Sequence, residues 1–437
     1  MKIPKRIAQA LINSLKGGVV PRVGLQYVAV GRKDEIDALL RDVEIVADGG
    51  ASFRFIVGQY GSGKSFLLQT IRNYVMAKNF VVVDADLSPE RRLQGTRGQG
   101  LATYKELIRN MSTKTKPEGG ALSLILDRWI SSVQQEVMAS SGLGATDPGL
   151  PKLVEKRISA VIYSLNEMVH GFDFARLLTL YYEAHIQGDD ALKAKVLKWF
   201  RGEYPTKSEA RQELGVNIVI TDDDWYEYLK LFAAFLKQAG YAGMLVLIDE
   251  LVNIYKIPNA ITRQYNYEKI LTMYNDTMQG KAQHFGIILC GTPQCMEDPR
   301  RGVYSYEALR SRLAEGHFTG EHKDLLSPVI RLQPLTHEEM LILIEKLADI
   351  HAGLYEYPQI VTEPDMVDFI QIEFSRIGAD THITPREVIR DFIQVLDIVY
   401  QNPGVKVREL LGSDRFTFAQ NAVEEEETSP GFAEFEL

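Results

Sequence analysis

The most constraining part of this sequence is a glycine-rich loop that separates an apolar, strand-like run from an apolar helical pattern. The loop consists of Gly58, Gln59, Tyr60, Gly61, Ser62, Gly63, Lys64 and Ser65. It matches the pattern G-x-x-x-x-G-K-[ST] between a strand and a helix, where backbone N–H groups and a helix N-terminus can surround phosphate oxygens. We therefore expect Lys64 to reach the β- and γ-phosphates of a nucleotide and the Ser65 hydroxyl to hold Mg²⁺. The alternative is a chance glycine-rich turn.

Two later apolar runs end in side chains that suit the same chemistry. Residues 244–248 are apolar and lead into Asp249 and Glu250, and a further run, 285–291, leads into Thr292. Asp249 is expected to hold Mg²⁺, directly or through water, and Glu250 to orient and polarise an attacking water. Thr292 could hydrogen-bond the γ-phosphate or that water. The alternative for Thr292 is a simple turn before Pro293 at the end of the strand.

Three arginines in the second half of the chain are candidates for charge stabilisation. Arg310 and Arg312 lie in a short helical segment, and one of them could project toward the γ-phosphate of a neighbouring subunit as an arginine finger. Arg386 follows Thr384 and Pro385 at the start of a helix, and it could contact the nucleotide from a C-terminal helical bundle. In each case the alternative is an ordinary solvated surface arginine.

The order of apolar runs predicts an α/β fold with a parallel sheet. Strand-like runs at 53–57, 80–86, 244–249, 285–291 and 329–335 are separated by segments with helical periodicity. The expected regions are an N-terminal arm (1–30), a nucleotide-binding core (31–335) with a helical insertion at about 101–240, a helical lid (336–402) and a C-terminal acidic tail (403–437). The tryptophans of the insertion are expected to fill its core, with stacking on nucleic-acid bases as the alternative.

Composition limits the compartment and the partners. The sequence has only two cysteines and no uninterrupted apolar run long enough for a membrane span, so we expect a cytoplasmic protein without a membrane partner. A net charge of −9 argues against a general nucleic-acid-binding surface but leaves DNA contact possible at local basic segments. These segments are the N-terminal arm, the loop 88–100 with Arg91, Arg92 and Arg97, and residues 105–116. The alternatives are a solvated or packing face for the arm and a mobile surface loop for 88–100.

The order of these features resembles that of AAA+ ATPases, and Val30-Gly31-Arg32 with Glu35 is similar to the initiator and STAND-type branches. In those branches the segment around Arg32 lines the adenine pocket. The resemblance implies a P-loop NTPase core in which Lys64 and Ser65 form Walker A, and Asp249 and Glu250 form Walker B. It further implies the following roles: sensor 1 for Thr292, the arginine finger for Arg310 or Arg312, and sensor 2 for Arg386.

More closely, the chain resembles the BrxD-like P-loop ATPases of BREX-type phage-defence loci. The resemblance rests on residues 58–65, 84–90 (DADLSPE), 199–203 (WFRGE), 210–215 (ARQELG) and 247–250 (LIDE). It implies binding of ATP and Mg²⁺, ATP hydrolysis in a homo-oligomer, and action with other proteins of the same locus against invading DNA. Two alternatives are a slow ATP-gated switch and a scaffold that assembles a protein complex without acting on DNA directly.

Overall fold

The computed structural model describes residues 3–313, 324–376 and 384–411. The chain divides into two compact units. The core unit consists of residues 33–59 and 67–332, and the lid unit consists of residues 1–32, 60–66 and 333–437. The glycine-rich loop therefore begins in the core unit and continues in the lid unit.

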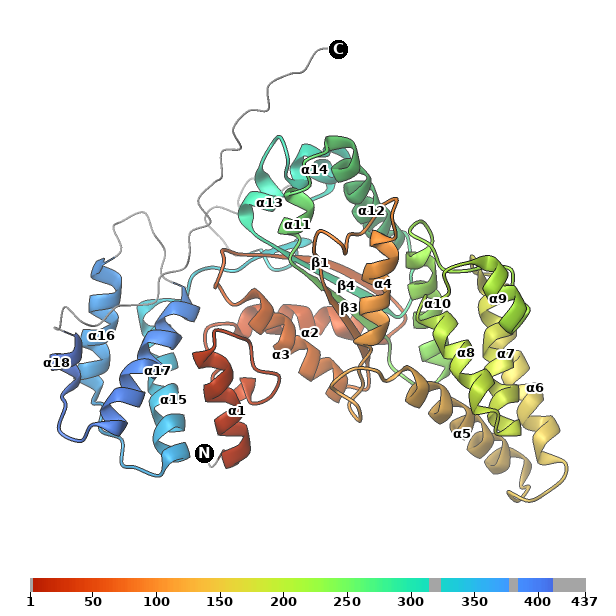
Figure 1. The fold of residues 1–437 in the computed structure, drawn as a ribbon, viewed down its shortest axis with the longest axis horizontal. Coiled ribbons are helices and arrows are strands. Elements are labelled where there is room, and N and C mark those ends of the chain that lie inside the picture. Colours follow the sequence, from red (N-terminus) through yellow and green to blue (C-terminus); the bar gives the residue numbers. More distant parts are fainter. Residues whose placement is uncertain (1–2, 314–323, 377–383, 412–437) are drawn as a thin grey trace, which may run out of the picture. The chain divides into compact units, whose positions relative to one another are not determined.

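The core unit is built on a sheet of five parallel strands in the order β2-β3-β4-β1-β5 (Figure 1). The strands are β1 (Ala51–Val57), β2 (Val81–Asp86), β3 (Met244–Asp249), β4 (Phe285–Gly291) and β5 (Val329–Arg331). All five strands predicted from the sequence are present. Strands β3 and β4 are buried along their whole length, as expected for central strands of a parallel sheet.

Helices cover both faces of the sheet. Side chains on β3 alternate between two apolar clusters, with Met244, Val246 and Ile248 in one and Leu245 and Leu247 in the other. Helix α2 (Lys33–Ala47) and the part of α3 (Lys64–Ala77) from Leu67 onward supply the cluster that contains Leu245. Helices α4 (Gln99–Arg109), α10 (Trp225–Gln238) and α12 (Ala260–Met278) pack against strands on the other face. The predicted α/β core is therefore confirmed.

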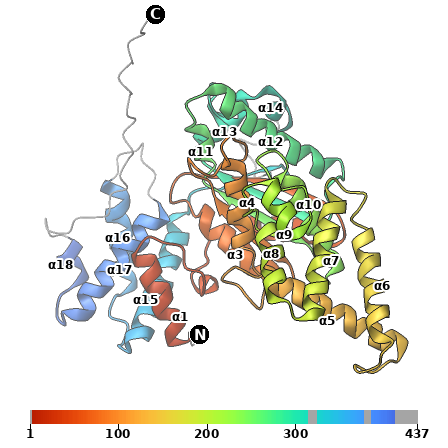
Figure 2. The ribbon, with the colours of Figure 1, turned by 45° about the vertical axis from the view of Figure 1, so that its right-hand side comes forward.

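A large helical insertion separates β2 from β3, as predicted (Figures 1 and 2). Its helices are α4 (Gln99–Arg109), α5 (Leu122–Ser141), α6 (Leu150–Tyr163), α7 (Gly171–Gln187), α8 (Asp190–Phe200), α9 (Lys207–Leu214) and α10 (Trp225–Gln238). Trp129, Trp199 and Trp225 are at most 1% exposed. They therefore fill the core of the insertion, and the alternative of stacking on nucleic-acid bases is wrong.

Further helical elements of the core unit follow β3 and β4 in the chain. They are α11 (Val252–Tyr255), α12 (Ala260–Met278), α13 (Pro293–Glu297), η2 (Val303–Ser305) and α14 (Glu307–Leu313). Helix α14 packs against α12 and η2. Arg310 and Arg312 therefore lie in a short helix, as the sequence predicted.

The lid unit is a helical bundle that includes the N-terminal arm. Its elements are α1 (Lys5–Lys16), η1 (Leu25–Tyr27), α15 (His337–Tyr355), α16 (Glu363–Arg376), α17 (Pro385–Gln401) and α18 (Val407–Leu411). Helix α1 buries Leu11 and Ile12 in the same apolar cluster as α15 and α17. Helix α18 occupies the start of the region expected to be a tail, and the acidic run falls in residues 412–437, outside the described part of the chain.

The N-terminal arm packs on the bundle, and two of its basic residues pair with acidic residues there. The ammonium group of Lys16 contacts the Asp397 carboxylate at 2.5 Å, and that of Lys5 contacts Glu356 at 2.9 Å. Ala29 accepts a hydrogen bond from Lys346 at 2.8 Å. Of the two interpretations of the arm, the structure supports the packing face.

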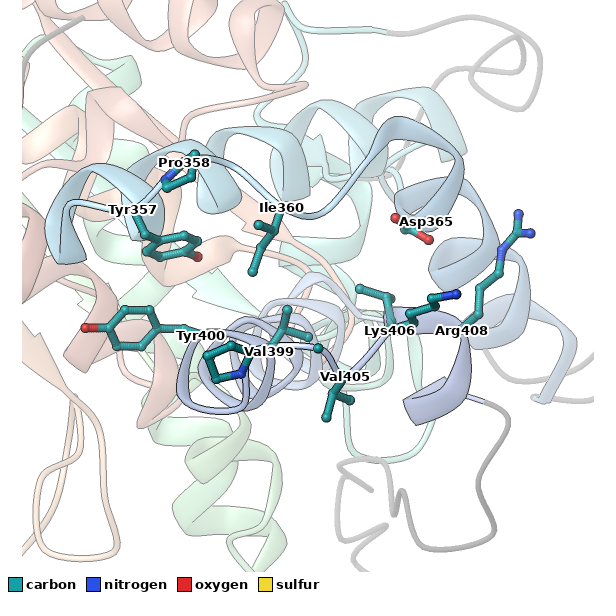
Figure 3. Close-up of a pocket in the computed structure, with 12 residues that line it drawn as sticks. Tyr357, Pro358, Ile360, Asp365, Val399, Tyr400, Val405, Lys406 and Arg408 are labelled. Carbon is teal, nitrogen blue, oxygen red and sulfur yellow. The ribbon is translucent and has the colours of Figure 1, made fainter.

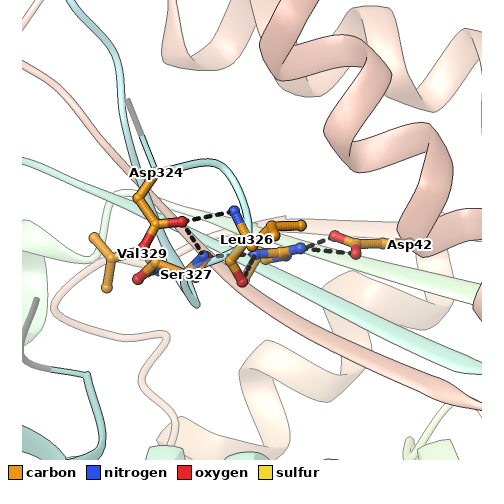
Figure 4. A network of polar contacts seen from close by, with 6 residues as sticks. Asp42, Asp324, Leu326, Ser327 and Val329 are labelled. Carbon is orange, nitrogen blue, oxygen red and sulfur yellow. Dashed lines mark hydrogen bonds and ion pairs between the residues drawn. The ribbon is translucent and has the colours of Figure 1, made fainter. Parts of the chain in front are cut away.

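A buried ion pair connects β1 to α2 and to the segment before β5 (Figure 4). The Arg54 guanidinium donates to both carboxylate oxygens of Asp42, at 2.6 and 2.8 Å. It also donates to the carbonyl oxygens of Leu326 and Ser327. The backbone N–H groups of Leu326 and Ser327 in turn donate to the Asp324 carboxylate. One guanidinium thus fixes the chain where it enters the edge strand β5.

Replacement of Asp42 by Ala is expected to lower the free energy of unfolding by about 3–5 kcal/mol, because it leaves the buried Arg54 charge without its counter-ion. Glu44→Ala on the same helix is the matched control: Glu44 pairs with Lys78 at 3.2 Å on the exposed surface. Such exposed pairs contribute at most about 1 kcal/mol. Denaturant unfolding followed by circular dichroism measures both variants, and equal losses would contradict this role for Arg54.

Candidate functional site

The carboxyl ends of three neighbouring strands bring several predicted residues to one edge of the sheet. Val57 of β1 pairs with Gly291 of β4, and the Gly58 N–H donates to the Gly291 carbonyl at 3.1 Å. On the other side of β4, Ile248 of β3 pairs with Leu289. Gly58, Asp249, Glu250 and Thr292 therefore leave the sheet at the same edge. In open parallel sheets this edge is where ligands bind.

The end of β3 is a tight turn built around the two predicted carboxylates. Asp249 is buried, and its Oδ1 accepts the backbone N–H of Glu250 at 2.8 Å. Glu250 has a φ of +60°, in the left-handed region that residues with a Cβ seldom adopt. Such backbone conformations require support from their surroundings and cluster at functional sites. The turn therefore fixes the backbone conformation of Glu250 at the end of β3.

A third carboxylate lies beside Asp249 and was not among the predicted site residues. Asp86, the last residue of β2, pairs directly with Asp249 in the sheet register. Partial burial, and next the negative charges of Asp249 and Asp84, raise the pKa of Asp86 above its usual value. Its position at the end of an apolar run was visible in the sequence. Its pairing with Asp249 depends on the strand order, which the sequence pattern does not give.

The side-chain oxygens at this edge could hold Mg²⁺ only together with oxygen atoms of a bound nucleotide or of water. Within the described residues, no three His, Cys, Asp or Glu side chains are arranged so that they could hold a metal ion alone. Mg²⁺ in proteins is commonly held by one or two carboxylates together with substrate phosphates and water. Asp249 could supply one such carboxylate, and the roles of Asp249 and Ser65 as metal ligands stay predictions.

Thr292 has a local structural role at the end of β4. Its hydroxyl oxygen accepts the backbone N–H of Cys295 at 3.3 Å and so caps the N-terminus of α13. The residue is 6% exposed. This cap matches the interpretation as a strand-end turn. Because a hydroxyl can donate as well as accept, the cap is compatible with a further contact to a phosphate or water, which stays a prediction.

The glycine-rich loop 58–65, here called the phosphate loop, has a backbone that requires glycine. Gly61 and Gly63 have φ values of +74° and +94°. A Cβ at Gly63 would meet no atom within 4 Å, whereas one at Gly61 would lie 2.6 Å from the Thr384 Cβ. Helix α3 begins at Lys64, whose ammonium nitrogen lies 5.4 Å from the centre of the Tyr60 ring. The loop thus has one open side and one side closely covered by the lid helix α17.

Arg32 braces the phosphate loop within the lid unit. Its guanidinium is 6% exposed and donates to the Ser62 carbonyl at 3.0 Å. The preceding residue, Gly31, has a φ of +69°, and a Cβ there would lie 2.7 Å from the Glu339 carboxyl group. Arg32 therefore has an observed role in holding the loop. The contact with an adenine base implied by the resemblance stays a prediction.

The two glycines next to Arg32 and Ser62 are each covered by the capping box of a lid helix. In α15 the Thr336 hydroxyl accepts the Glu339 N–H and the Glu339 carboxylate accepts the Thr336 N–H. In α17, Thr384 and Glu387 make the same pair of hydrogen bonds. The N-termini of both lid helices are thus fixed against the segments 31–32 and 61–62.

The three candidate arginines lie on the surface of their own units. Arg386 is exposed in the first turn of α17, and its Cδ lies near Gly18 of the N-terminal arm. Arg310 is exposed and lies 3.9 Å from Glu307, while Arg312 is exposed and donates to the Ala308 carbonyl at 2.7 Å. These positions are compatible with both alternatives, so the finger and sensor 2 roles stay predictions.

The arginine- and glycine-rich loop after β2 makes several hydrogen bonds to other parts of the core unit, which argues against its interpretation as a mobile surface loop. The buried Asn266 side chain accepts the N–H groups of Leu93 and Gln94 and donates to the Gln94 carbonyl. Trp225 donates to the Leu93 carbonyl, and Asp222 accepts the N–H of Gly98. Several distant parts of the core unit thus hold the backbone of this loop.

One comparison with known proteins matches almost the whole chain. The model of a protein family described as "BREX system ATP-binding protein BrxC/D" matches residues 3–415. None of the curated proteins matches this chain. Among the described helices, none is both long enough and apolar enough to cross a membrane.

Gly61→Ala is expected to weaken ATP binding at least tenfold, because the new Cβ would overlap Thr384 and force the phosphate loop away from α17. Removing the overlapping side chain in Gly61→Ala/Thr384→Gly is expected to restore part of that affinity. The remaining loss reflects the strain of a non-glycine residue at positive φ. Isothermal titration calorimetry with ATP measures all three proteins.

Gly188→Ala is the matched control, since Gly188 has a φ of +69° but no atom within 4 Å of its Cβ position. It carries the same backbone strain without the overlap, so ATP affinity should stay at the wild-type value. Unchanged ATP affinity in Gly61→Ala, or no recovery on adding Thr384→Gly, would show that the contact with α17 does not hold the loop.

Proposed function

The chain belongs to the family of BREX system ATP-binding proteins, and from that premise we propose that it is an Mg²⁺-dependent ATP hydrolase that works as an oligomer in phage defence. The observation that carries the proposal is the common edge of β1, β3 and β4. There the start of the phosphate loop, Asp249, Glu250 and Thr292 leave neighbouring parallel strands. A loop that only binds ATP would not need a second carboxylate in the position of Glu250.

In this proposal the chain's own residues position the reacting groups. The backbone N–H groups of the phosphate loop and the Lys64 ammonium group bind the β- and γ-phosphates, while Ser65 and Asp249 hold Mg²⁺. The ion, when bound, neutralises charge on the phosphates. Glu250 accepts a hydrogen bond from the attacking water and orients it toward the γ-phosphate. Hydrolysis by this route depends mainly on positioning and charge neutralisation, which is why a fixed turn at Glu250 matters.

The exposed arginines of α14 support an oligomer. Arg310 and Arg312 are exposed, and the contacts that they make with described residues lie within their own short helix. A guanidinium presented in this way is available to stabilise the transition state at a neighbouring subunit's γ-phosphate. Each site would then be complete only where two subunits meet.

The distribution of charge favours a protein partner over direct binding of DNA. Lys5 and Lys16 of the basic arm are paired with acidic residues of the lid unit. The arginine loop after β2 is bordered by Asp222 and Asp223, which bind its backbone and the Gln94 side chain. Phosphate groups bind best where positive charge is uncompensated. We infer that contact with invading DNA is made mainly through other proteins of the defence locus.

A slow ATP-gated switch is the second candidate function, and the bracing of the phosphate loop favours it. Thr384 and Glu339 of the lid helices lie against Gly61 and Gly31. A nucleotide that orders the loop would therefore also order the lid, whatever the rate of hydrolysis. Stimulation of turnover by a partner protein distinguishes the hydrolytic machine from the switch.

Lys64→Ala and Glu250→Gln separate binding from hydrolysis. Lys64→Ala should weaken ATP binding and abolish turnover, because it removes the positive charge on the phosphates. Glu250→Gln should retain ATP affinity within a few-fold and lower kcat by at least about a hundredfold, since an amide is a far weaker acceptor for the water proton. Phosphate release and ATP titration measure these effects, and full activity in Glu250→Gln would contradict the assignment.

Arg310→Ala or Arg312→Ala should lower kcat by at least tenfold with little change in ATP affinity, because the finger acts in the transition state. Arg157→Ala is the control, since Arg157 is also a partly exposed arginine in a surface pair, with Glu136 at 3.0 Å. Mixing the arginine variant with Lys64→Ala protein should restore part of the activity if the arginine acts across subunits. Wild-type kcat in both arginine variants would remove the finger from the mechanism.

A further inference from the structure

The lid unit contains a groove that none of the proposed ATP chemistry uses (Figure 3). It has a volume of about 600 Å³ and runs between two segments, 357–365 and 399–408. Tyr357 and Tyr400 lie at one end, and Asp365, Lys406 and Arg408 lie at the other (Figure 3). Ile360, which lines the middle, is 44% exposed. The groove is therefore an accessible, mainly apolar site with a charged end.

A buried histidine, His351, supports the aromatic end of the groove. The rings of Tyr357 and Tyr400 lie 5.0 Å apart, and the Tyr357 hydroxyl lies 2.8 Å from Nδ1 of His351. His351 is completely buried, and its Nε2 lies 3.2 Å from Asp397, which also binds Lys16 of α1. Burial, with the Asp397 charge, raises the pKa of Tyr357 to about 12, so the ring is neutral at pH 7. Because Tyr357 is already fixed in this way, little conformational entropy is lost at this end of the groove when a ligand binds.

At the charged end of the groove, one lysine can form an ion pair with an acidic group of a ligand. Arg408 is committed to Asp368 at 2.7 Å, and Asp365 accepts hydrogen bonds from Thr362 at the start of α16. Lys406 is exposed, and no acidic side chain among the described residues forms an ion pair with it. The kind of ligand that fits the groove is thus an extended peptide in which aromatic or apolar side chains lie next to carboxylates.

The chain itself carries such a peptide after α18. Residues 432–437 read Phe-Ala-Glu-Phe-Glu-Leu and follow the acidic run 424–427. They lie outside the described residues. Its two phenylalanines match the apolar and aromatic lining, and the neighbouring glutamates, Glu434 and Glu436, match the charge of Lys406.

The covalent connection makes binding within the same chain favourable. Helix α18, whose Val407 lines the groove, ends at Leu411, and 20 residues separate Leu411 from Phe432. A chain of that length reaches up to about 70 Å at about 3.5 Å per residue, so it can reach back to the groove. A tether of this kind also raises the effective concentration to the millimolar range, so that a weak contact is mostly formed.

We propose that the groove between residues 357–365 and 399–408 binds the aromatic–acidic segment 432–437 of the same chain. The segment then blocks the groove against peptides of similar chemistry in partner proteins, and a partner gains access by displacing it. This inference does not depend on ATP hydrolysis, so it can fail or succeed independently of the proposed function.

The test uses a fluorescein-labelled peptide of residues 428–437 and full-length protein, with binding followed by fluorescence anisotropy. The peptide is expected to bind Phe432→Ala/Phe435→Ala protein at least tenfold more tightly than wild-type protein, whose own segment competes. A peptide with the same two substitutions should not bind. Adding Lys406→Glu to the double variant should weaken binding several-fold, whereas Lys195→Glu on α8 should not.

Three outcomes of the peptide-binding measurements would overturn the proposal. They are failure of the peptide to bind the double variant, equal affinity for the double variant and wild-type protein, and unchanged affinity after Lys406→Glu. A wild-type dimer that dissociates on Phe432→Ala/Phe435→Ala would assign the segment to a second copy and would also overturn binding within one chain. Lys406→Glu changes an exposed side chain, so its effect can be measured on a folded protein.

Discussion

The rest of the structure depends on a loop whose backbone only glycine adopts without strain. Gly61 and Gly63 of the phosphate loop have positive φ, and such a loop keeps one conformation only if its neighbours hold it. The neighbours are Arg32, which binds the Ser62 carbonyl, and Thr384, which covers Gly61. The loop is thus continuous with β1 in the core unit and braced by helices of the lid unit.

This bracing connects residues 60–65 of the phosphate loop with the packing of the lid unit. The capping boxes of α15 and α17 stabilise their own helices and also contact Gly31 and Gly61. The same bundle contains the N-terminal helix α1 and the groove with Tyr357 and Tyr400. A ligand at the loop and a peptide at the groove would therefore act on one set of packed helices, which is the arrangement that coupling between two sites requires.

The sequence predicted the features that are local in the chain. The phosphate loop, the ends of β3 and β4, and the capping at Thr336 and Thr384 follow from spacing and residue type over a few positions. The helical insertion and its buried tryptophans followed from periodicity. The resemblance to a known family could be seen from the sequence because several such local motifs follow one another along the chain in the order typical of that family.

The remaining features depend on residues that are distant in the sequence. Strand order decides that Asp86 pairs with Asp249, and no periodicity of the single sequence encodes it. The contact of Thr384 with Gly61 and the anchoring of Leu93 by Asn266 likewise depend on tertiary packing. The loop after β2 is rich in glycine and arginine, and such a composition is typical of mobile loops. Its anchor, the side-chain amide of the buried Asn266, lies far away in the sequence.

In the function proposed above, the phosphate loop serves an ATP-hydrolysing site that a neighbouring subunit completes. The most direct test is the specific rate of Mg²⁺-dependent phosphate release from ATP, measured over a wide range of protein concentration. The account predicts that the rate per chain is low in dilute solution and rises to a plateau as subunits associate. A rate per chain that is independent of concentration would contradict the shared site, and absence of phosphate release at every concentration, with partner proteins of the locus added, would contradict hydrolysis itself.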